Sequence, residues 1–186
     1  MAMVFVITGP SGVGKGTLIR GLRGQVPQLE LSVSATTRKP RPGEREGVDY
    51  HFMTPEEFTA RVAAGDFVEH ATYSGNMYGT LRSELERHVA AGAPVVLEIE
   101  VQGARQVREA IPEAVAVFIA PPSLDGLRTR LIGRGTDGPE EVDERLRTAE
   151  RELEARPEFG YVVVNDRLED ATGELVEIVR SELPRE

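Results

Sequence analysis

Four short apolar runs recur along the chain, and segments with helical periodicity separate them. The runs cover residues 3–8, 94–101, 114–120 and 161–165. Continuous apolar runs of this length, bounded by glycine, proline or polar residues, are typical of parallel strands that are buried on both faces. Their alternation with helices predicts an α/β fold in which a parallel sheet is covered by helices on both faces.

Capping residues mark the ends of several predicted helices. Thr54 is a favourable N-cap, Pro55 suits the first helical position, and Glu57 completes a capping box. Ser123 caps a later helix, which is expected to end near Gly133.

The stretch from about residue 34 to residue 80 breaks the alternation of buried strands and helices. It follows a strand-like run at 29–35 and contains a loop rich in proline, glycine and charge at 38–50. Residues 67–73 alternate between apolar and polar, which predicts a half-buried strand, and residues 74–80 are interpreted as a turn. We therefore expect an insertion in the parallel-sheet core.

The composition of the 186-residue chain is that of one domain with a sizeable core, since 40% of the residues are hydrophobic. The chain has no cysteine, which excludes disulfides and thiolate metal sites and suits a reducing cytosol. No apolar run approaches the roughly 18 to 20 residues of a membrane helix, and the N-terminus lacks the basic segment of a signal peptide. We therefore expect a cytoplasmic protein without a membrane partner.

The net charge of −9 results from 31 acidic and 22 basic residues. A chain this acidic is a poor general binder of nucleic acid, because its overall field repels polyanions. Any anionic small molecule must therefore be held by local basic groups that act against this field.

Residues 9–17 read GPSGVGKGT, which is close to the phosphate-loop pattern G-x-x-x-x-G-K-[ST]. The segment follows a predicted buried strand and opens a predicted helix, as the motif requires. Its glycines let backbone N–H groups turn inward around a phosphate, the helix N-terminus adds partial positive charge, and Lys15 can reach the terminal phosphates. The predicted nucleotide-phosphate site comprises Gly9, Pro10, Ser11, Gly12, Val13, Gly14, Lys15, Gly16 and Thr17.

Gly16 stands where a hydroxyl directly after the lysine normally ligates Mg²⁺. The ion is therefore expected to be held mainly by nucleotide phosphates and water, with Thr17 contacting it directly or through water. Glu98 and Glu100 end a predicted strand at the carboxyl edge of the sheet and, being two residues apart, should point to one face. We expect them to hold the water shell of Mg²⁺ or to bind the acceptor; pairing with a nearby arginine is the alternative.

Residues 34–45 carry four basic side chains against one acid, Glu44, which reverses the charge of the chain locally. The guanidinium groups of Arg38 and Arg41 suit bidentate binding of a phosphate. A solvated surface loop is the alternative. The position of this segment in an insertion beside a phosphate loop favours a second phosphate site.

These motifs together resemble those of guanylate kinases. The stretch SVSATTRKPRPGEREGVDYHF is accompanied, in the order of that family, by GPSGVGKGT, FVEHATYSGNMYGT, LEIEVQGA, FIAPPS, L-x-x-RG and VVVND. The resemblance covers about residues 4–183, and the combination is far more specific than any single motif. It implies a P-loop kinase fold and transfer of a phosphoryl group from ATP to GMP or dGMP, with Mg²⁺.

The resemblance implies a site for the GMP phosphate. By similarity, Arg38 and Arg41 hold this phosphate, and the hydroxyl groups of Tyr50 and Tyr78 assist them. Tyr78 belongs to the motif YGT, in which Gly79 permits close approach of the backbone.

The resemblance also implies residues that recognise the guanine base. By similarity, Ser34 and Thr80 donate to guanine O6, and Glu69 accepts from N1–H and from the 2-amino group. Glu98 and Glu100 complete the implied GMP site, although Glu100 stands where the family more often has aspartate.

A parallel-sheet core, a small mixed GMP-binding insertion and a lid are the three parts that the resemblance implies. Arg134 and Arg145 match lid arginines and are expected to act catalytically with Lys15, and Asn165 matches the stretch near the ATP base. The expected boundaries are 1–33, 84–124 and 156–186 for the core, 34–83 for the insertion and 125–155 for the lid.

Other functions remain open at this point. A protein-binding module could use the same fold, but it need not keep an intact phosphate loop with Lys15. A kinase for AMP, TMP or a sugar bisphosphate would share the core, and Ser34, Glu69 and Thr80 argue against it. A GTPase-like switch needs a guanine-reading N-K-x-D element, and VVVND is not that motif. We therefore favour ATP and GMP as small-molecule partners, while the sequence indicates no oligomeric state.

Overall fold

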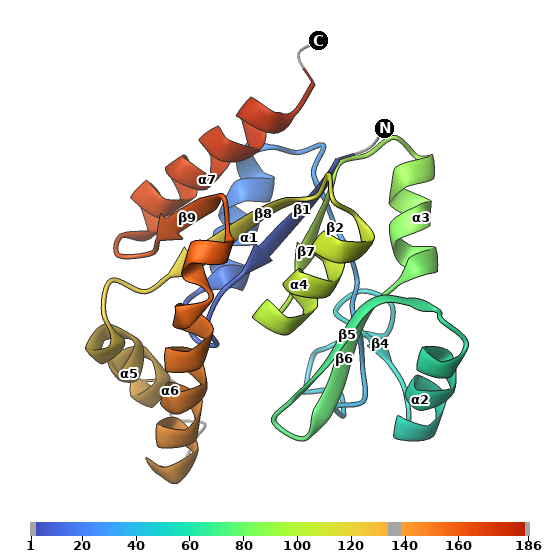
Figure 1. Ribbon diagram of the computed structural model, residues 1–186, viewed down its shortest axis with the longest axis horizontal. Helices are drawn as coiled ribbons and strands as arrows, with labels where there is room; N and C mark the ends of the chain where they lie inside the picture. Colours follow the sequence, from blue (N-terminus) through green and yellow to red (C-terminus); the bar gives the residue numbers. More distant parts are fainter. Residues whose placement is uncertain (1–2, 134–138, 185–186) are drawn as a thin grey trace.

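The computed structural model describes residues 3–133 and 139–184, which form an α/β structure built on two sheets (Figure 1). In these ranges the larger sheet has five strands, all parallel, in the order β2-β7-β1-β8-β9. Its strands are β1 (Val4–Thr8), β2 (Glu30–Leu31), β7 (Val95–Glu98), β8 (Val115–Ala120) and β9 (Tyr161–Val164). The predicted parallel-sheet core is confirmed.

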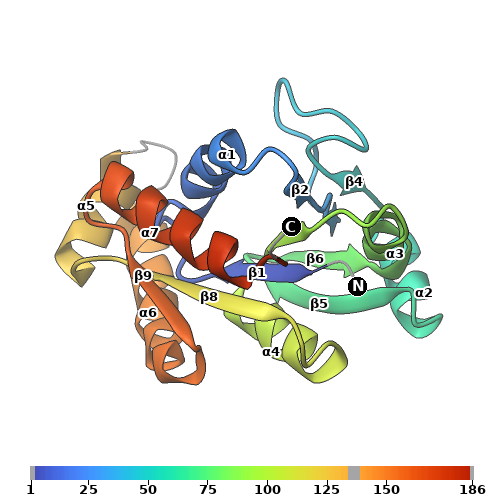
Figure 2. The same cartoon turned by 90° about the horizontal axis from the view of Figure 1, so that it is seen from above.

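Helices cover both faces of the larger sheet, as the view from above shows (Figure 2). These helices are α1 (Lys15–Gln25), α3 (Arg82–Ala90), α4 (Val101–Ala110) and α7 (Leu168–Glu182). Phe5 and Ile7 of β1 belong to the core shared with α1 and α7, whereas Val4 and Val6 belong to the core shared with α3 and α4. Because both faces are buried, β1 is apolar at successive positions.

A second sheet lies beside the core and, in the described ranges, has four strands in the order β4-β3-β6-β5. They are β3 (Ala35–Thr36), β4 (His51–Phe52), β5 (Phe67–Tyr73) and β6 (Asn76–Leu81). The β3-β4 pair is parallel and the other two pairs are antiparallel, which agrees with the expected mixed insertion. Helix α2 (Pro55–Ala63) begins with the predicted capping box and buries Phe58 against Phe67, with 4.4 Å between ring centroids.

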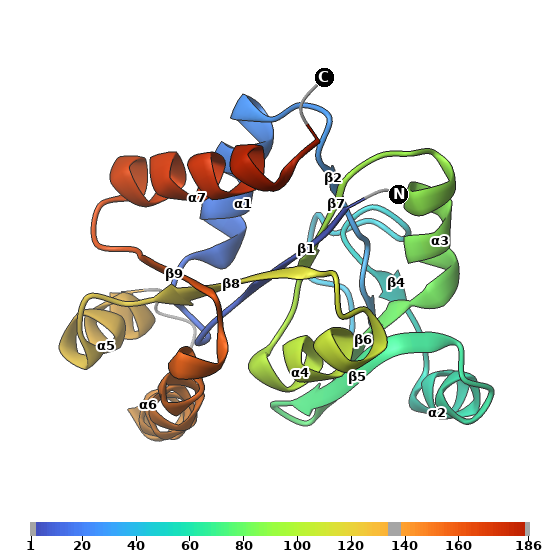
Figure 3. The same cartoon turned by 45° about the horizontal axis from the view of Figure 1, so that its top comes forward.

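Helices α5 (Leu124–Gly133) and α6 (Pro139–Glu154) pack together at the end of the core that lies away from α2 (Figure 3). The N–H of Gly126 donates to Ser123 Oγ at 3.0 Å, so the expected cap of α5 is present. A short 3₁₀ helix, η1 (Arg156–Glu158), then leads to β9. No helix in the described ranges combines the length and the apolar composition that crossing a bilayer requires.

Two expectations about strands were wrong. The turn expected at 74–80 is confined to Ser74 and Gly75, whose φ angles are 47° and 74°, and the rest of that segment belongs to β6. Two residues with positive φ make a tight hairpin that matches the twist of the strands, so the polar residues after it can pair with β5. The run at 29–35 is not one strand, because β2 pairs in the core sheet and β3 pairs in the second sheet.

Candidate active site

The predicted phosphate loop connects β1 to the N-terminus of α1. Gly9, Gly12 and Gly14 have φ angles of 138°, 86° and 98°, a region that residues with a Cβ rarely adopt. At Gly9 a Cβ would also overlap the carbonyl oxygen of Ile119 in β8. Helix α1 begins at Lys15, and the N–H groups of Thr17 and Leu18 already donate to the carbonyl oxygen of Gly14. Those of Lys15 and Gly16 are therefore the ones that remain at the loop.

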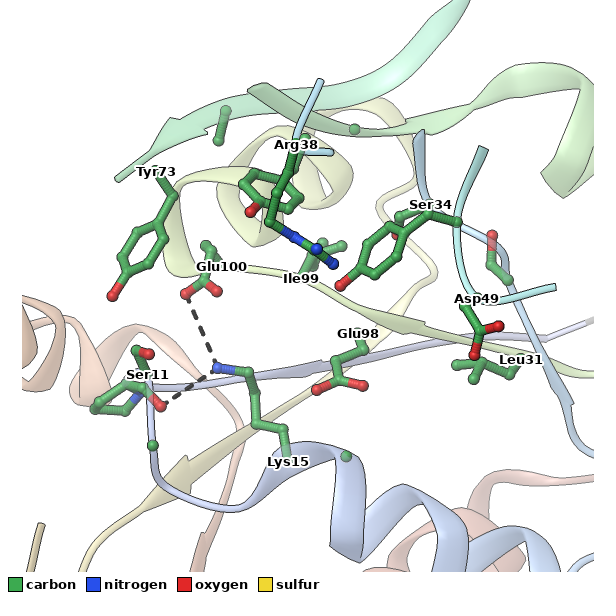
Figure 4. A pocket seen from close by; sticks show the side chains of 18 of the residues that line it. Ser11, Lys15, Leu31, Ser34, Arg38, Asp49, Tyr73, Glu98, Ile99 and Glu100 are labelled. Atoms are coloured by element: carbon green, nitrogen blue, oxygen red, sulfur yellow. Dashed lines mark hydrogen bonds and ion pairs between the residues drawn. The ribbon is translucent and has the colours of Figure 1, made fainter. Parts of the chain in front are cut away.

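Lys15 is buried beside the loop, with 8% of its surface exposed. Its Nζ donates to the carbonyl oxygens of Gly9 at 2.5 Å and Pro10 at 3.3 Å. It also forms an ion pair with Glu100, whose Oε2 is 3.9 Å away (Figure 4). These contacts keep the cation within the loop before any phosphate is bound.

A cavity of about 530 Å³ separates the phosphate loop from the second sheet. Lys15 and Ser11 lie on one side of it, Arg38 and Ser34 lie on the other, and Glu98 lies between them (Figure 4). A volume of this order suits a small-molecule site. The residues predicted for the donor and for the acceptor therefore share one cavity.

Most of the site residues predicted from the sequence line this cavity. Among the described residues, four do not: Gly9, Val13, Thr80 and Asn165. Arg134 lies outside the described residues.

Asn165 supports the phosphate loop from behind. It is 6% exposed, and its Nδ2 donates to the carbonyl oxygen of Val13 at 2.7 Å. A Cβ at Gly14 would lie 2.6 Å from the same Nδ2, so this glycine also makes room for the amide. Asn165, expected beside the ATP base, thus contacts the loop backbone rather than the cavity.

Arg38 and Arg41 are organised by Glu44, which the sequence marked only as the single acid of its segment. Glu44 Oε1 accepts from Arg38 Nη2 at 2.8 Å, and Glu44 Oε2 accepts from the Arg41 backbone N–H at 2.7 Å. The Arg38 guanidinium lies 5.2 Å from the ring centroid of Tyr50, whose ring is 6.3 Å from that of Tyr78. Burial raises the pKa of Tyr50, so its hydroxyl stays protonated and can donate.

Glu69 is a buried carboxylate, with 3% of its surface exposed. Its Oε1 accepts a hydrogen bond from Thr80 Oγ1 at 2.8 Å. Burial raises the pKa of Glu69 to about 7; hydrogen bonds with Thr80 oppose this rise, and the charge of Glu100 adds to it. Thr80 is fully buried and donates this hydrogen bond to Glu69, and its expected contact with guanine O6 stays a prediction.

Gly103, in the first turn of α4, makes room for Glu69. A Cβ at this position would overlap Glu69 Oε2 and would lie 3.0 Å from Glu69 Cδ. The sequence analysis did not single out Gly103. Glycine inside a helix costs about 1 kcal/mol relative to alanine, so its presence in LEIEVQGA was the available sign of a close approach.

Glu98 and Glu100 both line the cavity, but strand alternation is not the reason. Strand β7 ends at Glu98, and Glu100 is the N-cap residue of α4, which corrects the expectation of one continuous strand. Glu98 is accessible from the cavity, yet the surrounding protein desolvates its carboxylate and raises its pKa, while Lys15 acts in the opposite direction. The hydroxyl of Thr17, the residue expected to contact Mg²⁺, accepts a hydrogen bond from Arg20 Nη2 at 3.0 Å.

Arg145 connects α6 to the phosphate loop. Its Nη2 donates to Ser11 Oγ at 2.7 Å, and the residue lines the cavity. The site therefore receives residues from the core, from the second sheet and from α6.

The family model described as guanylate kinase matches residues 1–182. The chain belongs to the guanylate kinase family. It is 53% identical to a guanylate kinase of Frankia casuarinae over 94% of this chain and 95% of the relative. It is 56% identical to one of Thermosynechococcus vestitus, over 89% and 87%. The crystal structure of guanylate kinase from Anaplasma phagocytophilum matches with a TM-score of 0.79, 34% identity and coverage of 99% and 87%.

The raised pKa of Glu69 makes the stability of this guanylate kinase family member depend on pH. Because the folded-state pKa of about 7 exceeds the ordinary value of 4.5, the folded protein binds the proton more tightly than the unfolded chain. The contribution of Glu69 to the free energy of unfolding therefore falls as pH rises from about 4.5 to about 7.

We predict that Glu69→Gln stabilises the protein at pH 8 by up to about 3 kcal/mol and has little effect below pH 5. Glutamine keeps an acceptor for Thr80 and carries no charge. Urea unfolding of both proteins across this pH range measures the difference. The exposed Glu56, changed to glutamine, is the control and should give no such pH-dependent difference. A difference that is constant with pH would contradict the assignment.

Proposed function

We propose that this chain transfers the γ-phosphoryl group of ATP to GMP, and by the same contacts to dGMP. The observation that carries the proposal is that Lys15 of the phosphate loop lines the same cavity as Arg38 and Glu69. Transfer between two phosphate groups requires that both substrates meet in one site. Membership of the guanylate kinase family supports this choice of substrates.

The donor ATP binds at the phosphate loop. The N–H groups at the start of α1 and the ammonium of Lys15 cradle the terminal phosphates and neutralise their charge. To reach a phosphate, Lys15 exchanges the carbonyls of Gly9 and Pro10 for phosphate oxygens. Asn165 keeps the loop in shape through Val13.

The phosphate of the acceptor binds at Arg38 and Arg41, with the hydroxyls of Tyr50 and Tyr78. Glu44 prepares the Arg38 guanidinium in a fixed orientation, which reduces the conformational entropy lost on binding. A phosphate monoester is already anionic near neutral pH, so no general base is needed to generate the nucleophile.

The guanine base binds at Ser34, Glu69 and Thr80, and Gly79 permits close approach of the backbone. Guanine presents two donors along one edge, N1–H and the 2-amino group, and the ionised Glu69 carboxylate offers two acceptors. Thr80 and Gly103 hold this carboxylate in position. Adenine has a lone pair at N1 and lacks the 2-amino group, so it would leave Glu69 desolvated and without donors.

Mg²⁺ fits the oxygen-rich side of the cavity. Thr17 Oγ1 and the Glu98 carboxylate are hard oxygen donors, and a Cβ at Gly16 would lie 3.5 Å from Glu98 Oε1, so Glu98 is adjacent to the loop. In the described ranges no group of three or more histidine, cysteine, aspartate or glutamate residues is placed to hold a metal ion. Thr17 would contact the ion, and Glu98 and Glu100 would hold its waters. When bound, Mg²⁺ neutralises charge on the β- and γ-phosphates.

Residues 125–155 are proposed as a lid that carries Arg134 and Arg145 to the transferring phosphoryl group. Closure of such a lid excludes water and suppresses hydrolysis of ATP.

The insertion 34–83 is proposed as the acceptor-binding part. The reaction is proposed as a cytoplasmic step of purine nucleotide metabolism. A protein-binding module or a kinase for another acceptor is not favoured, since the relatives compared above are named guanylate kinases.

A panel of nucleoside monophosphates tests the proposed reaction. With ATP and Mg²⁺ present, we predict ADP formation with GMP and dGMP, and at most a weak rate with AMP, CMP or TMP, measured in a coupled assay. Turnover with AMP or TMP but not with GMP would reject the proposal.

Lys15→Ala should lower the turnover with GMP by about 10³-fold or more, because Lys15 neutralises the charge of the transferring phosphoryl group.

The role of Glu69 predicts a change in base choice. Glu69→Gln replaces one acceptor by a donor, so kcat/KM for GMP should fall by at least about 10²-fold, since sites built to hydrogen-bond a substrate discriminate strongly. The weak rate with AMP should change much less. A parallel fall in both rates would show that Glu69 does not recognise the base.

Gly103→Ala should separate acceptor binding from donor binding. The added methyl group displaces the Glu69 carboxylate, so the KM for GMP should rise by about 10-fold or more while the KM for ATP stays within about twofold. The free energy of unfolding should fall by about 1 to 3 kcal/mol, because the methyl group overlaps a buried carboxylate and the better helix propensity of alanine offsets only part of this cost. Gln102→Ala, at the exposed neighbouring position, is the control. An unchanged KM for GMP in Gly103→Ala would contradict the positioning role.

A further inference from the structure

Helix α4 packs alongside strand β5 of the second sheet (Figure 3). Val68 of the strand belongs to the same hydrophobic cluster as Ala104 and Val107 of the helix. The helix lies in the core as its boundaries were expected from the sequence, whereas the strand lies in the insertion proposed to bind the acceptor. The contact between α4 and β5 therefore joins these two parts of the chain.

Strand β5 is irregular where it meets the helix. Its register with β6 shifts between Phe67 and Glu69. Successive side chains of a regular strand point to opposite faces, and an irregularity of this kind re-aims them. Here both Val68 and Glu69 reach α4, because Val68 packs in the shared cluster and a Cβ at Gly103 would overlap Glu69 Oε2. The direction of the Glu69 carboxylate therefore depends on how this irregular stretch is held.

The side chain of Gln106 in α4 pairs with both backbone groups of His70. In the described ranges β5 is an edge strand, and an edge strand presents N–H and C=O groups that no neighbouring strand pairs. Gln106 Oε1 accepts from the His70 N–H at 3.1 Å, and Gln106 Nε2 donates to the His70 carbonyl oxygen at 2.7 Å. The same Nε2 donates at 3.5 Å to the carbonyl oxygen of Gln102, one turn earlier in the helix. The carboxamide thus gives β5 the acceptor and the donor that another strand would supply.

Neither Gln106 nor His70 lines the cavity, whereas Glu69, directly before His70, does. Gln106 and Gly103 are three residues apart in α4, so they lie on one side of the helix. Gly103 leaves room for the Glu69 carboxylate, and Gln106 holds the backbone of the next residue. Any effect of Gln106 on turnover must therefore pass through the strand that carries Glu69.

We propose that Gln106 is a positioning residue that pairs with the edge of β5 at His70 and thereby fixes the direction of the Glu69 carboxylate toward the acceptor base. The inference rests on the proposed function, in which Glu69 recognises guanine. Two hydrogen bonds from one carboxamide to one residue set both the distance and the rotation of the strand relative to α4. Without them the strand can shift along the helix, and small misplacements of a group that contacts the substrate have large effects on rate.

Gln106→Met tests the pairing, because methionine keeps the length and helix propensity of glutamine but offers no strong donor or acceptor. The value of kcat/KM for GMP should fall by about 10-fold or more, while the KM for ATP stays within about twofold. In the Glu69→Gln background, Gln106→Met should lower kcat/KM for GMP by no more than about a further twofold, since the group that it positions is already altered. Gln102→Met, at an exposed position of the same helix, is the matched control and should keep wild-type kinetics.

Hydrogen exchange of the His70 amide, measured by NMR, reports on the pairing without any assay of activity. We expect slow exchange in the wild type and in Gln102→Met, and exchange at least about 10-fold faster in Gln106→Met. Unchanged exchange at His70, an unchanged kcat/KM for GMP, a parallel rise in the KM for ATP, or multiplied losses in the double variant would each overturn the proposal. A wild-type protein without GMP turnover would instead reject the proposed function, and the exchange experiment would still decide whether the pairing exists.

Discussion

Lys15 is the buried cation around which the acidic groups of the cleft are arranged. It lies 3.9 Å from Glu100, and its charge opposes the rise in the pKa of Glu98. Without this ammonium, the carboxylates of Glu98 and Glu100 would line the cavity with no buried cation beside them. Since the backbone carbonyls of Gly9 and Pro10 also hold Lys15, the geometry of the loop and the charge balance of the cleft depend on the same side chain.

A chain of net charge −9 can bind anions only if positive groups are concentrated locally. The structure achieves this twice, with Lys15 at the phosphate loop and with Arg38 beside Tyr50. In both places the cation already donates hydrogen bonds to an acceptor within the protein. Arg38 donates to the Glu44 carboxylate, and Lys15 donates to backbone carbonyls. In the proposed reaction, a phosphate would therefore replace these existing partners and would meet each cation already oriented, which reduces the conformational entropy lost on binding.

The strands and residues that the sequence predicted well are those defined by local patterns. Strand β1 is apolar along its length, and the phosphate loop has a fixed spacing around Lys15, so neither needs knowledge of distant contacts. Strand β6 was missed because Asn76 and Gly79 favour turns, and only its pairing with β5 makes it a strand. Gly103 was missed for a related reason, because it makes room for Glu69, which is far away in the sequence.

The proposed specificity for guanine follows from the burial that disfavours the ionised form of Glu69. Its desolvation disfavours the ionised form whether or not a ligand is present, and the single hydrogen bond from Thr80 compensates only part of this effect. A ligand that brings two donors to the carboxylate relieves the desolvation, whereas a ligand of the same shape without them leaves it in full and adds repulsion between lone pairs. The preference for one base therefore does not depend on an especially strong contact. It depends on the exclusion of water from the carboxylate. Thr80, Gly103 and the first turn of α4 surround Glu69 and leave only 3% of its surface exposed.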